Sequence, residues 1–358
     1  MTHGEGYSAQ VGYRGPAMKG IWITKHGGPG VLQVRETPDP TPKAGEVRVR
    51  AKACGLNFAE VTARQGLYPD APKPPCIVGY EGAGVIDAVG DGVPASRVGE
   101  RVLYLSRFGG HADTVCVPQA QALVIPDSMS FEDGAALPVT YLAAYRMLFR
   151  VRRIQPGETI LVHMAAGGVG TAVLQLCKQV EGVVTYGTAS ASKHDFVRSQ
   201  GCTHPIDYRT LDYVAEVKRL TQGKGVDLVL DPLGGGDWKK GYELLRPAGM
   251  LIAFGMANVN TGGTRNLLHV LSTLWKVPKY SPMSIMDTNR SIAGVNVGHL
   301  WDELDMLTGE MRELLKLYEQ GAIKPHVSKV FPFSKAGDAH GELEHGKNVG
   351  KVLLVPDP

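Results

Sequence analysis

The sequence predicts an α/β protein that combines a β-rich, barrel-like domain with a doubly wound domain around a parallel sheet. Short β-like runs separated by Gly and Pro fill the first third of the 358-residue chain. From about Tyr141, strand-like runs alternate with amphipathic helical runs, as in parallel sheets covered by helices. A glycine-rich turn joins the first of these strands to the helix after it, which favours a Rossmann-type domain.

The predicted elements follow one another in a simple order. Strands of the β-rich domain are expected at residues 20–24, 31–35, 46–53, 82–89, 101–105 and 113–117. The second domain should contain strands at 160–163, 183–187, 227–230 and 250–254, and helices at 171–180, 193–200 and 212–220. A helix at 310–320 and strands at 329–333 and 350–355 then return to the first domain. The predicted division is a flexible leader at 1–17, the β-rich domain at 18–140 and 306–358, and the doubly wound domain at 141–305.

The turn that opens the second domain has the pattern Ala165-x-Gly167-x-x-Gly170. Gly167 permits a tight bend, and Gly170 permits close packing of the helix against the strand. Phosphates bind at such a helix N-terminus because its backbone N–H groups are free and the helix dipole is positive there. An ordinary glycine turn is the alternative. The flanking strand and helix favour a dinucleotide site with contacts from Ala166, Gly167, Gly168, Val169 and Gly170.

The end of the next strand predicts which dinucleotide binds. An NAD enzyme places Asp or Glu about 20 residues after the glycine turn, where the carboxylate binds the ribose 2′-hydroxyl. This segment has no acid and offers Ser190 and Lys193, with Tyr208 and Arg209 after the next apolar run. Hydroxyl and cationic groups suit a dianionic 2′-phosphate, so we predict NADPH. If Lys193 is only solvated and Tyr208 only ends a strand, the choice between NADPH and NADH stays undecided.

Composition limits the classes of function. A net charge of +3 without a basic run argues against nucleic acid as a partner. The five cysteines are scattered and form no C-x-x-C pair, so neither a disulfide framework nor a cysteine-rich zinc site is expected, and the compartment should be reducing. Residues 1–16 lack the apolar core of a signal peptide, and no apolar stretch has the length of a membrane span. We therefore expect a soluble cytoplasmic protein.

Several ordered motifs carry a resemblance to known families. The segments ACGLNF (53–58), RQGLY (64–68), GYEGAGV (79–85) and AAGGVG (165–170) resemble the quinone oxidoreductase (zeta-crystallin) branch of the medium-chain dehydrogenase/reductase superfamily. The segments VHMAAGGVG (162–170), GTASASKH (187–194), DPLGG (231–235) and KNVGKVLLVP (347–356) resemble, more closely, the synaptic vesicle membrane protein homologue family. The similarity runs from about Met18 to the C-terminus. It implies a GroES-like catalytic domain joined to a Rossmann domain.

The resemblance also implies that the chain binds no zinc. Zinc enzymes of the superfamily place Cys and His at two positions that here hold Asn57 and Tyr80, and neither is a usual zinc ligand. The four-cysteine structural lobe of many of those enzymes is missing as well, and His111 and Cys116 are not expected to be ligands. Without a Lewis acid, the hydride acceptor must already be electrophilic, such as a quinone or an α,β-unsaturated carbonyl.

Asn57 and Tyr68 are the catalytic residues that the resemblance implies, because quinone oxidoreductases line the acceptor site with Asn and Tyr at this spacing. Each could donate a hydrogen bond to the substrate oxygen, directly or through water. The alternative is structural: Asn57 caps a helix that begins near Phe58, and Tyr68 is a half-buried aromatic residue. One departure affects the mechanism, because Ala143 stands where the family has a threonine. Thr140 could replace that hydroxyl only if it lies on the same helical face.

Further cofactor contacts are expected where strands end at the carboxyl edge of the sheet. Gly255 and Met256 follow the last predicted strand of the second domain, and Gly255 permits close approach of the nicotinamide. Asn348 and Lys351 resemble family residues that lie near the cofactor. A lysine at 351 that was merely solvated would look the same in the sequence.

Residues 259–299 are unusually apolar for this position in a quinone oxidoreductase. A helix at 265–276 that turns Leu267, Leu271, Leu274 and Trp275 inward would be ordinary core. Otherwise the segment is a lid or wall for a large hydrophobic substrate, or a surface that meets lipid or a second subunit.

The leading hypothesis is an NADPH-dependent, zinc-independent oxidoreductase that transfers hydride to a small hydrophobic quinone or α,β-unsaturated carbonyl. An enoyl or enone reductase of a biosynthetic pathway is an alternative within this class. The rival from another class is a weakly catalytic NADPH-binding protein that acts in lipid or protein association, with peripheral lipid contact. A homodimer is expected by resemblance only.

Overall fold

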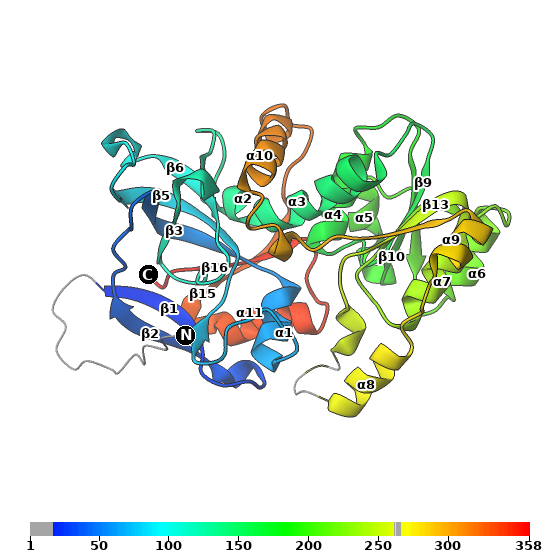
Figure 1. Cartoon of the computed structure of the whole chain (residues 1–358), viewed down its shortest axis with the longest axis horizontal. Helices are drawn as coiled ribbons and strands as arrows, with labels where there is room; N and C mark the ends of the chain where they lie inside the picture. The colour runs from blue at the N-terminus through cyan, green and yellow to red at the C-terminus, as the bar shows by residue number, and fades with distance from the viewer. Residues whose placement is uncertain (1–16, 261, 263–265) are drawn as a thin grey trace.

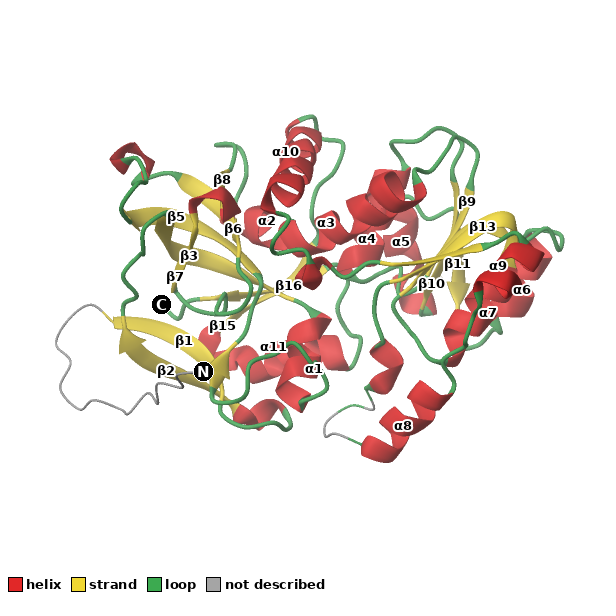
Figure 2. Cartoon of the chain, in the orientation of Figure 1, coloured by secondary structure: helices red, strands yellow, loops and turns green. Residues whose placement is uncertain are grey.

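The computed structural model describes residues 17–260, 262 and 266–358, which form two sheet-based domains side by side (Figures 1 and 2). The leader predicted at 1–17 lies outside the described residues, except for Ala17. Within the described ranges, no helix combines the length and the apolar composition needed to cross a bilayer.

The first domain is β-rich, as predicted. Its strands are β1 (Ala17–Ile23), β2 (Leu32–Pro38), β3 (Glu46–Leu56), β4 (Cys76–Ile77), β5 (Glu81–Val89), β6 (Arg101–Leu105), β7 (Thr114–Pro118), β8 (Ala122–Val124), β15 (Val327–Pro332) and β16 (Lys351–Val355). The larger sheet has the order β15-β16-β3-β5-β6-β8, with β7 paired to β3, and the smaller one has the order β2-β1-β4. The C-terminal strand β16 pairs antiparallel with β3 and so closes the domain around the end of the chain.

The second domain is a doubly wound parallel sheet. Its strands are β9 (Thr159–Val162), β10 (Val184–Ala189), β11 (His204–Asp207), β12 (Val226–Asp231), β13 (Leu245–Ala253) and β14 (Ser291–Gly294). Their order is β11-β10-β9-β12-β13-β14, and every neighbouring pair is parallel. The first strand along the chain therefore lies at the centre, where the strand order reverses, as in Rossmann domains. The connecting helices are α4 (Gly168–Cys177), α5 (His194–Gln200), α6 (Tyr213–Leu220), α7 (Gly236–Leu244), α8 (Leu267–Trp275) and α9 (Pro282–Thr288).

The remaining helices belong to the first domain or join it to the second. They are α1 (Phe58–Gln65), α2 (Phe131–Ala136), α3 (Pro138–Tyr145) with a π-helical continuation (Arg146–Arg152), α10 (Leu304–Glu319) and α11 (Ala336–Glu344). One apolar cluster contains residues from both sheets and from the joining helix, such as Leu103 in β6, Leu142 in α3 and Leu228 in β12. The two domains therefore share a core at their boundary, and α3 lies between them.

The predicted helix in the apolar 259–299 segment exists, but the core interpretation of it was wrong. Leu271 is 62% exposed and Trp275 is 88% exposed on α8, which projects from the edge of the second domain (Figure 1). The inward face of α8 is polar: Thr273 is buried, and the His269 ring nitrogen Nε2 lies 2.7 Å from the Asn258 carbonyl oxygen. Leu267, Leu274 and the neighbouring Leu268 are exposed as well.

Candidate cofactor and acceptor site

The turn between β9 and α4 requires glycine at position 170. A Cβ atom added to Gly170 would lie 2.5 Å from the Met164 carbonyl oxygen and 2.6 Å from the Ala165 Cα atom. The Gly167 N–H donates to the same Met164 carbonyl at 2.8 Å, which closes the turn. Gly167 is also the N-cap of α4 and has no side chain with which to cap it. The backbone N–H groups of residues 168–170 are therefore available to a phosphate.

The C-terminal segment lies directly against this turn. The Gly350 N–H donates to the Ala166 carbonyl at 2.8 Å. Gly350 has a φ of +71°, and a Cβ atom there would collide with the His326 carbonyl, so the position suits glycine alone. The next side chain, Lys351, runs past the start of α4, since a Cβ added to Gly168 would lie 3.8 Å from the Lys351 Cδ atom. Lys351 therefore connects the turn to the catalytic domain.

Two cations and a serine gather at the end of β10. Ser190 is the first residue after β10, and its carbonyl accepts the Lys193 N–H at 2.9 Å. The Lys193 ammonium donates to the Gly346 and Asn348 carbonyls at 2.7 and 2.6 Å. Burial lowers the pKa of Lys193, and the charge of Arg209 lowers it further. Lys193 is thus a fixed group next to a second cation, and the interpretation of it as a freely solvated lysine was wrong.

Tyr208 and Asn348 frame the same corner. Ala189 and Asp207 are paired in register, so the residues that follow them, Ser190 and Tyr208, leave the sheet side by side. Tyr208 is 53% exposed, which leaves its ring accessible to a ligand. The Asn348 side-chain amide donates to the Gly350 carbonyl at 2.8 Å, and this bond holds the loop that Lys193 also contacts.

Gly255 and Met256 lie at the carboxyl edge of the same sheet. A Cβ atom added to Gly255 would lie 3.0 Å from the Pro232 carbonyl oxygen. The segment after β13 therefore packs tightly on the segment after β12, and the Ala257 N–H donates to that Pro232 carbonyl at 2.8 Å. The backbone here is close enough to the edge to form the floor of a nicotinamide site.

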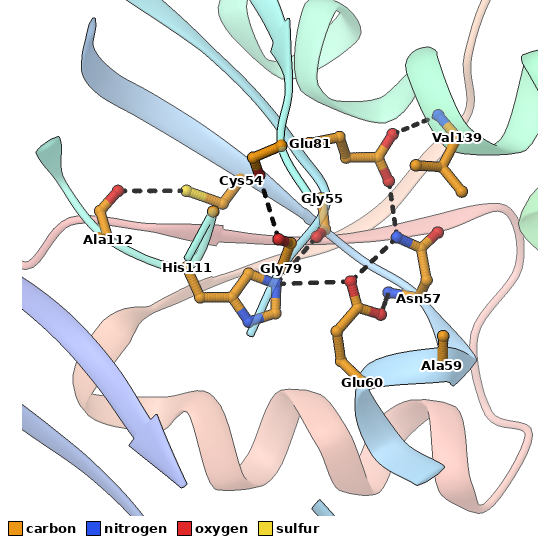
Figure 3. A network of polar contacts seen from close by, with 12 residues as sticks. Cys54, Gly55, Asn57, Ala59, Glu60, Gly79, Glu81, His111, Ala112 and Val139 are labelled. Carbon is orange, nitrogen blue, oxygen red and sulfur yellow. Dashed lines mark hydrogen bonds and ion pairs between the residues drawn. The ribbon is translucent and has the colours of Figure 1, made fainter. Parts of the chain in front are cut away.

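A buried polar network connects Asn57 with Lys351 (Figure 3 shows the Asn57 side). The Lys351 ammonium lies 2.5 Å from Asn57 Oδ1 and 2.5 Å from Glu81 Oε1. The Asn57 amide nitrogen donates to Glu81 Oε1 at 2.8 Å and to Glu60 Oε1 at 3.3 Å. The other Glu81 oxygen accepts the Val139 N–H at the start of α3, at 2.6 Å. Two carboxylates, one amide and one ammonium thus satisfy one another in the interior.

The network changes the interpretation of Asn57. Asn57 is the N-cap of α1, as the structural alternative expected, and its N–H donates to the Glu60 carboxylate at 2.9 Å. Both amide hydrogens point to carboxylates, so a donation to substrate requires one of these bonds to open. Burial raises the pKa of Glu60 to about 7. A protonated Glu60 would weaken one of the two bonds that hold the Asn57 amide.

Tyr68 belongs to an aromatic group rather than to this polar network. Its ring meets Tyr80 edge-on, with centroids 6.5 Å apart, and Tyr80 contacts Phe108 at 5.2 Å. Burial raises the pKa of Tyr68, so its phenol stays protonated and can donate. The structure therefore places Asn57 and Tyr68 at opposite ends of α1, in two different groups.

The positions that hold zinc ligands in related enzymes have other roles here. Asn57 holds Lys351, and Tyr80 is part of the aromatic group. His111 Nε2 lies 3.0 Å from the Gly55 carbonyl oxygen, and burial lowers the pKa of His111 to about 4. Cys116 lies on β7, and burial raises the pKa of its thiol to about 11. Over the part of the chain that the structure describes, no three His, Cys, Asp or Glu side chains form a group that could hold a metal ion.

Thr140 does not simply replace the hydroxyl that Ala143 lacks. Both residues lie on α3 and both are buried. The Thr140 hydroxyl donates back to the Ala136 carbonyl at 3.0 Å. Its methyl group faces the glycine turn, because a Cβ added to Gly168 would lie 2.9 Å from Thr140 Cγ2.

Three residues of the candidate site were missed by the sequence reasoning. Glu81 and Glu60 complete the buried network, and Trp301 joins the aromatic group with its ring parallel to that of Tyr80. Glu81 follows Tyr80 within a motif that was noted only for its zinc-ligand position, which was the available signal for it. No local pattern marks Trp301, which comes from the other end of the chain.

Known proteins support this assignment. Residues 43–127 match the profile of the alcohol dehydrogenase GroES-like domain, and residues 200–354 match a profile described as zinc-binding dehydrogenase. The chain is 49% identical over 327 residues to the human synaptic vesicle membrane protein VAT-1 homolog, a match that covers 91% of this chain and 83% of the relative. Two solved structures are similar over nearly their whole length. The quinone oxidoreductase of Escherichia coli complexed with NADPH has a TM-score of 0.83 at 31% identity, covering 94% of this chain and 100% of that one. The CurK enoyl reductase has a TM-score of 0.81 at 29% identity, covering 95% and 99%.

These matches confirm the resemblance and the fold class that the motifs predicted. The chain therefore belongs to the quinone oxidoreductase branch of the medium-chain dehydrogenase/reductase superfamily, and within it to the family of the synaptic vesicle membrane protein VAT-1 homologs.

Proposed function

We propose that the protein is an NADPH-dependent, zinc-independent reductase of a quinone or an α,β-unsaturated carbonyl. The observation that carries the proposal is the continuity of the site. The Ser190, Lys193 and Arg209 corner contacts residues 346–348, the same segment contacts the glycine turn, and Lys351 then reaches Asn57. A single stretch of backbone thus links a cationic corner suited to a 2′-phosphate with the polar network of the catalytic domain.

The residues fit an NADP cofactor in three places. The free N–H groups at the start of α4 suit the pyrophosphate, and the cationic corner suits the 2′-phosphate. Gly255 and Met256, at the carboxyl edge of the sheet, suit the nicotinamide, which supplies hydride when it is bound. The proposed contacts are Ala166, Gly167, Gly168, Val169, Gly170, Ser190, Lys193, Tyr208, Gly255, Met256, Asn348 and Lys351.

The acceptor side fits a molecule that is already electrophilic. Asn57 and Tyr80 cannot supply a Lewis acid at the positions that do so in the zinc enzymes, so the chain can offer only hydrogen-bond donors to the oxygen where charge develops. The Tyr68 phenol is one such donor, and Asn57 becomes another if a carboxylate releases it. Neighbours in this fold include a quinone oxidoreductase and an enoyl reductase, which supports both acceptor classes.

A second candidate function rests on the exposed apolar face of the 259–299 segment. Leu268, Trp275, Met283 and Met286 are between 70% and 88% exposed. Exposed apolar groups of this density on a projecting helix are typical of surfaces that meet lipid or another protein. We propose as the alternative that the protein binds NADPH with little turnover and acts through this face. The outer edge of β14, at the end of the sheet order, is where we would expect a homodimer to form.

The deciding experiment follows NADPH consumption by its absorbance against ortho- and para-quinones, alkenals and enoyl thioesters, with NADH in parallel. Turnover of one class with NADPH preferred supports the reductase. The matched test of the alternative is flotation with anionic vesicles and the oligomeric state of the triple variant L268S/L271S/W275S. NADPH binding without turnover, together with vesicle or partner binding that this variant loses, would favour the alternative.

A further inference from the structure

Trp301 completes an aromatic wall at the boundary of the two domains. It follows a short 3-10 turn (Val297–His299) of the second domain, whereas Tyr68, Tyr80 and Phe108 belong to the first. The Trp301 and Tyr80 rings are nearly parallel, with an interplanar angle of 9° and centroids 6.1 Å apart. Boundaries between domains are where small-molecule sites form most often, and flat conjugated ligands pack well on such rings.

The indole N–H of Trp301 has no partner in this wall. The side chain is 9% exposed, its Nε1 atom is buried, and none of the described residues accepts a hydrogen bond from it. An indole N–H can only donate, and buried donors in folded proteins are nearly always satisfied. An acceptor oxygen from a molecule other than the protein is therefore expected at this position.

Two further tryptophans have an unpartnered Nε1 atom but lie elsewhere. Trp22 is in β1, and Trp238 is in α7, where it packs on the apolar cluster of the second domain that contains Tyr242 and Leu244. Both are only half-buried as whole residues, whereas Trp301 is among the buried residues. Neither stacks on an aromatic residue of the candidate site, so they serve as controls rather than as rivals.

The position of Tyr80 ties Trp301 to the polar network. Tyr80 immediately precedes Glu81, whose carboxylate holds Lys351 and Asn57. On the other side, the loop that leads to Trp301 is fixed to the catalytic domain, because His299 Nε2 lies 2.6 Å from Asp70 Oδ2. The indole is therefore held between a fixed loop and the aromatic residue next to the network.

We infer that the Trp301 N–H donates a hydrogen bond to the carbonyl oxygen of the hydride acceptor, and that the acceptor is a flat conjugated carbonyl compound bound against the Tyr80–Trp301 wall. This inference rests on the proposed reductase function and specifies the acceptor class. It makes Trp301 an acceptor-binding residue, in addition to Tyr68. A ring-bearing ortho-quinone fits it better than a short aliphatic enal, which cannot cover the wall.

The test compares Trp301→Phe with Trp238→Phe, which removes an indole N–H from a site remote from the wall. W301F should lower kcat/KM for 9,10-phenanthrenequinone by roughly 10-fold or more. Its Kd for NADPH should stay at the wild-type value, and W238F should match the wild type in both measurements. Trp301→His, which returns a ring N–H, should recover part of the loss. Equal losses in W301F and W301H, or a wild-type kcat/KM in W301F, would overturn the inference.

A second measurement separates this inference from the proposed function. Calorimetric binding of 9,10-phenanthrenequinone to the complex with NADP⁺ needs no hydride transfer, so it is informative even if the wild type turns over no acceptor in the panel. W301F should bind the quinone roughly 10-fold more weakly than the wild type and W238F. Equal binding by all three proteins would overturn the inference and would leave a buried water as the partner of the indole.

Discussion

Lys351 and Glu81 form an ion pair inside the protein, with Nζ 2.5 Å from Oε1 and side chains that are 4% and 0% exposed. Lys351 is the first residue of the last strand, and Glu81 is the first residue of β5. Burying two charges is costly, and the cost is offset only when further hydrogen bonds satisfy them. Asn57 and the Val139 N–H provide those bonds. The end of the chain is thereby bonded to the interior of the catalytic domain.

Replacing Lys351 by Met should destabilise the fold by about 3–5 kcal/mol, because the Glu81 charge would be left buried without its partner. The measurement is the free energy of unfolding in denaturant. The control is Lys316→Met, which breaks an exposed pair with Glu313 and should cost less than about 1 kcal/mol. The double variant K351M/E81Q should lose less than the sum of the single variants. A K351M loss no larger than that of K316M would contradict this account of the pair.

The stability contribution of Glu60 should depend on pH. Burial raises the pKa of Glu60 to about 7 in the folded state, against a reference value of 4.5. Between these values the folded protein keeps a proton that the unfolded chain has released, so stability falls as the pH rises through this window. Glu60→Gln has no such term. The stability of E60Q relative to the wild type should therefore rise between pH 4.5 and 7, by at most about 3 kcal/mol.

His111 titrates in the opposite sense and must be separated from Glu60. The pKa of His111 is lowered to about 4, so the neutral folded ring loses stability as the pH falls below the value of a free histidine. This contribution is present in both E60Q and the wild type, and it cancels in the difference between them. A difference that stays flat from pH 5 to 8 would show that Glu60 is ionised throughout this range.

Arg209→Met should weaken NADPH binding by roughly 10-fold and leave NADH binding unchanged, because a charge-assisted contact to the 2′-phosphate would be lost. Arg209 is preferred to Lys193 for this test, since Lys193 also holds the loop at 346–348. Arg198→Met is the matched control, as Arg198 is an exposed residue of α5 that pairs with Asp195. Both Kd values can be measured by nucleotide fluorescence. Equal losses for NADPH and NADH would remove Arg209 from the 2′-phosphate site.

The sheets could be predicted from the sequence because their patterns are local. Val47, Val49 and Ala51 alternate with polar residues along β3, and the glycine turn lies between a strand and a helix. Element ends were less certain. The helix predicted at 310–320 begins at Leu304, because the helix continues through Gly309, which the sequence pattern placed before its start. The apolar stripe of α8 was assigned to the core because periodicity shows that one face is apolar but not which face is covered.

The candidate site could be predicted only where one segment contains it. The glycine turn and the Ser190 corner are each contained in a short stretch, so residue type and spacing were sufficient there. The Lys351–Glu81 pair joins residues 270 positions apart, and the Tyr80–Trp301 wall joins the two domains. Such contacts are set by the topology, in which β16 pairs with β3. The sequence marked Lys351 and Asn57 through a family resemblance, but nothing local shows that they bond to each other.

Gly170→Ala should abolish NADPH binding and destabilise the second domain, because its Cβ would lie 2.5 Å from the Met164 carbonyl and would force the turn open. Gly309→Ala is the matched control. Gly309 lies inside α10, and a Cβ there would meet nothing within 4 Å. Alanine is the better helix former, so G309A should stabilise the protein by about 0.5–1 kcal/mol and leave NADPH binding unchanged. Thermal unfolding with and without NADPH measures both effects. If G170A still gained stability on adding NADPH, the pyrophosphate would have to bind away from this turn.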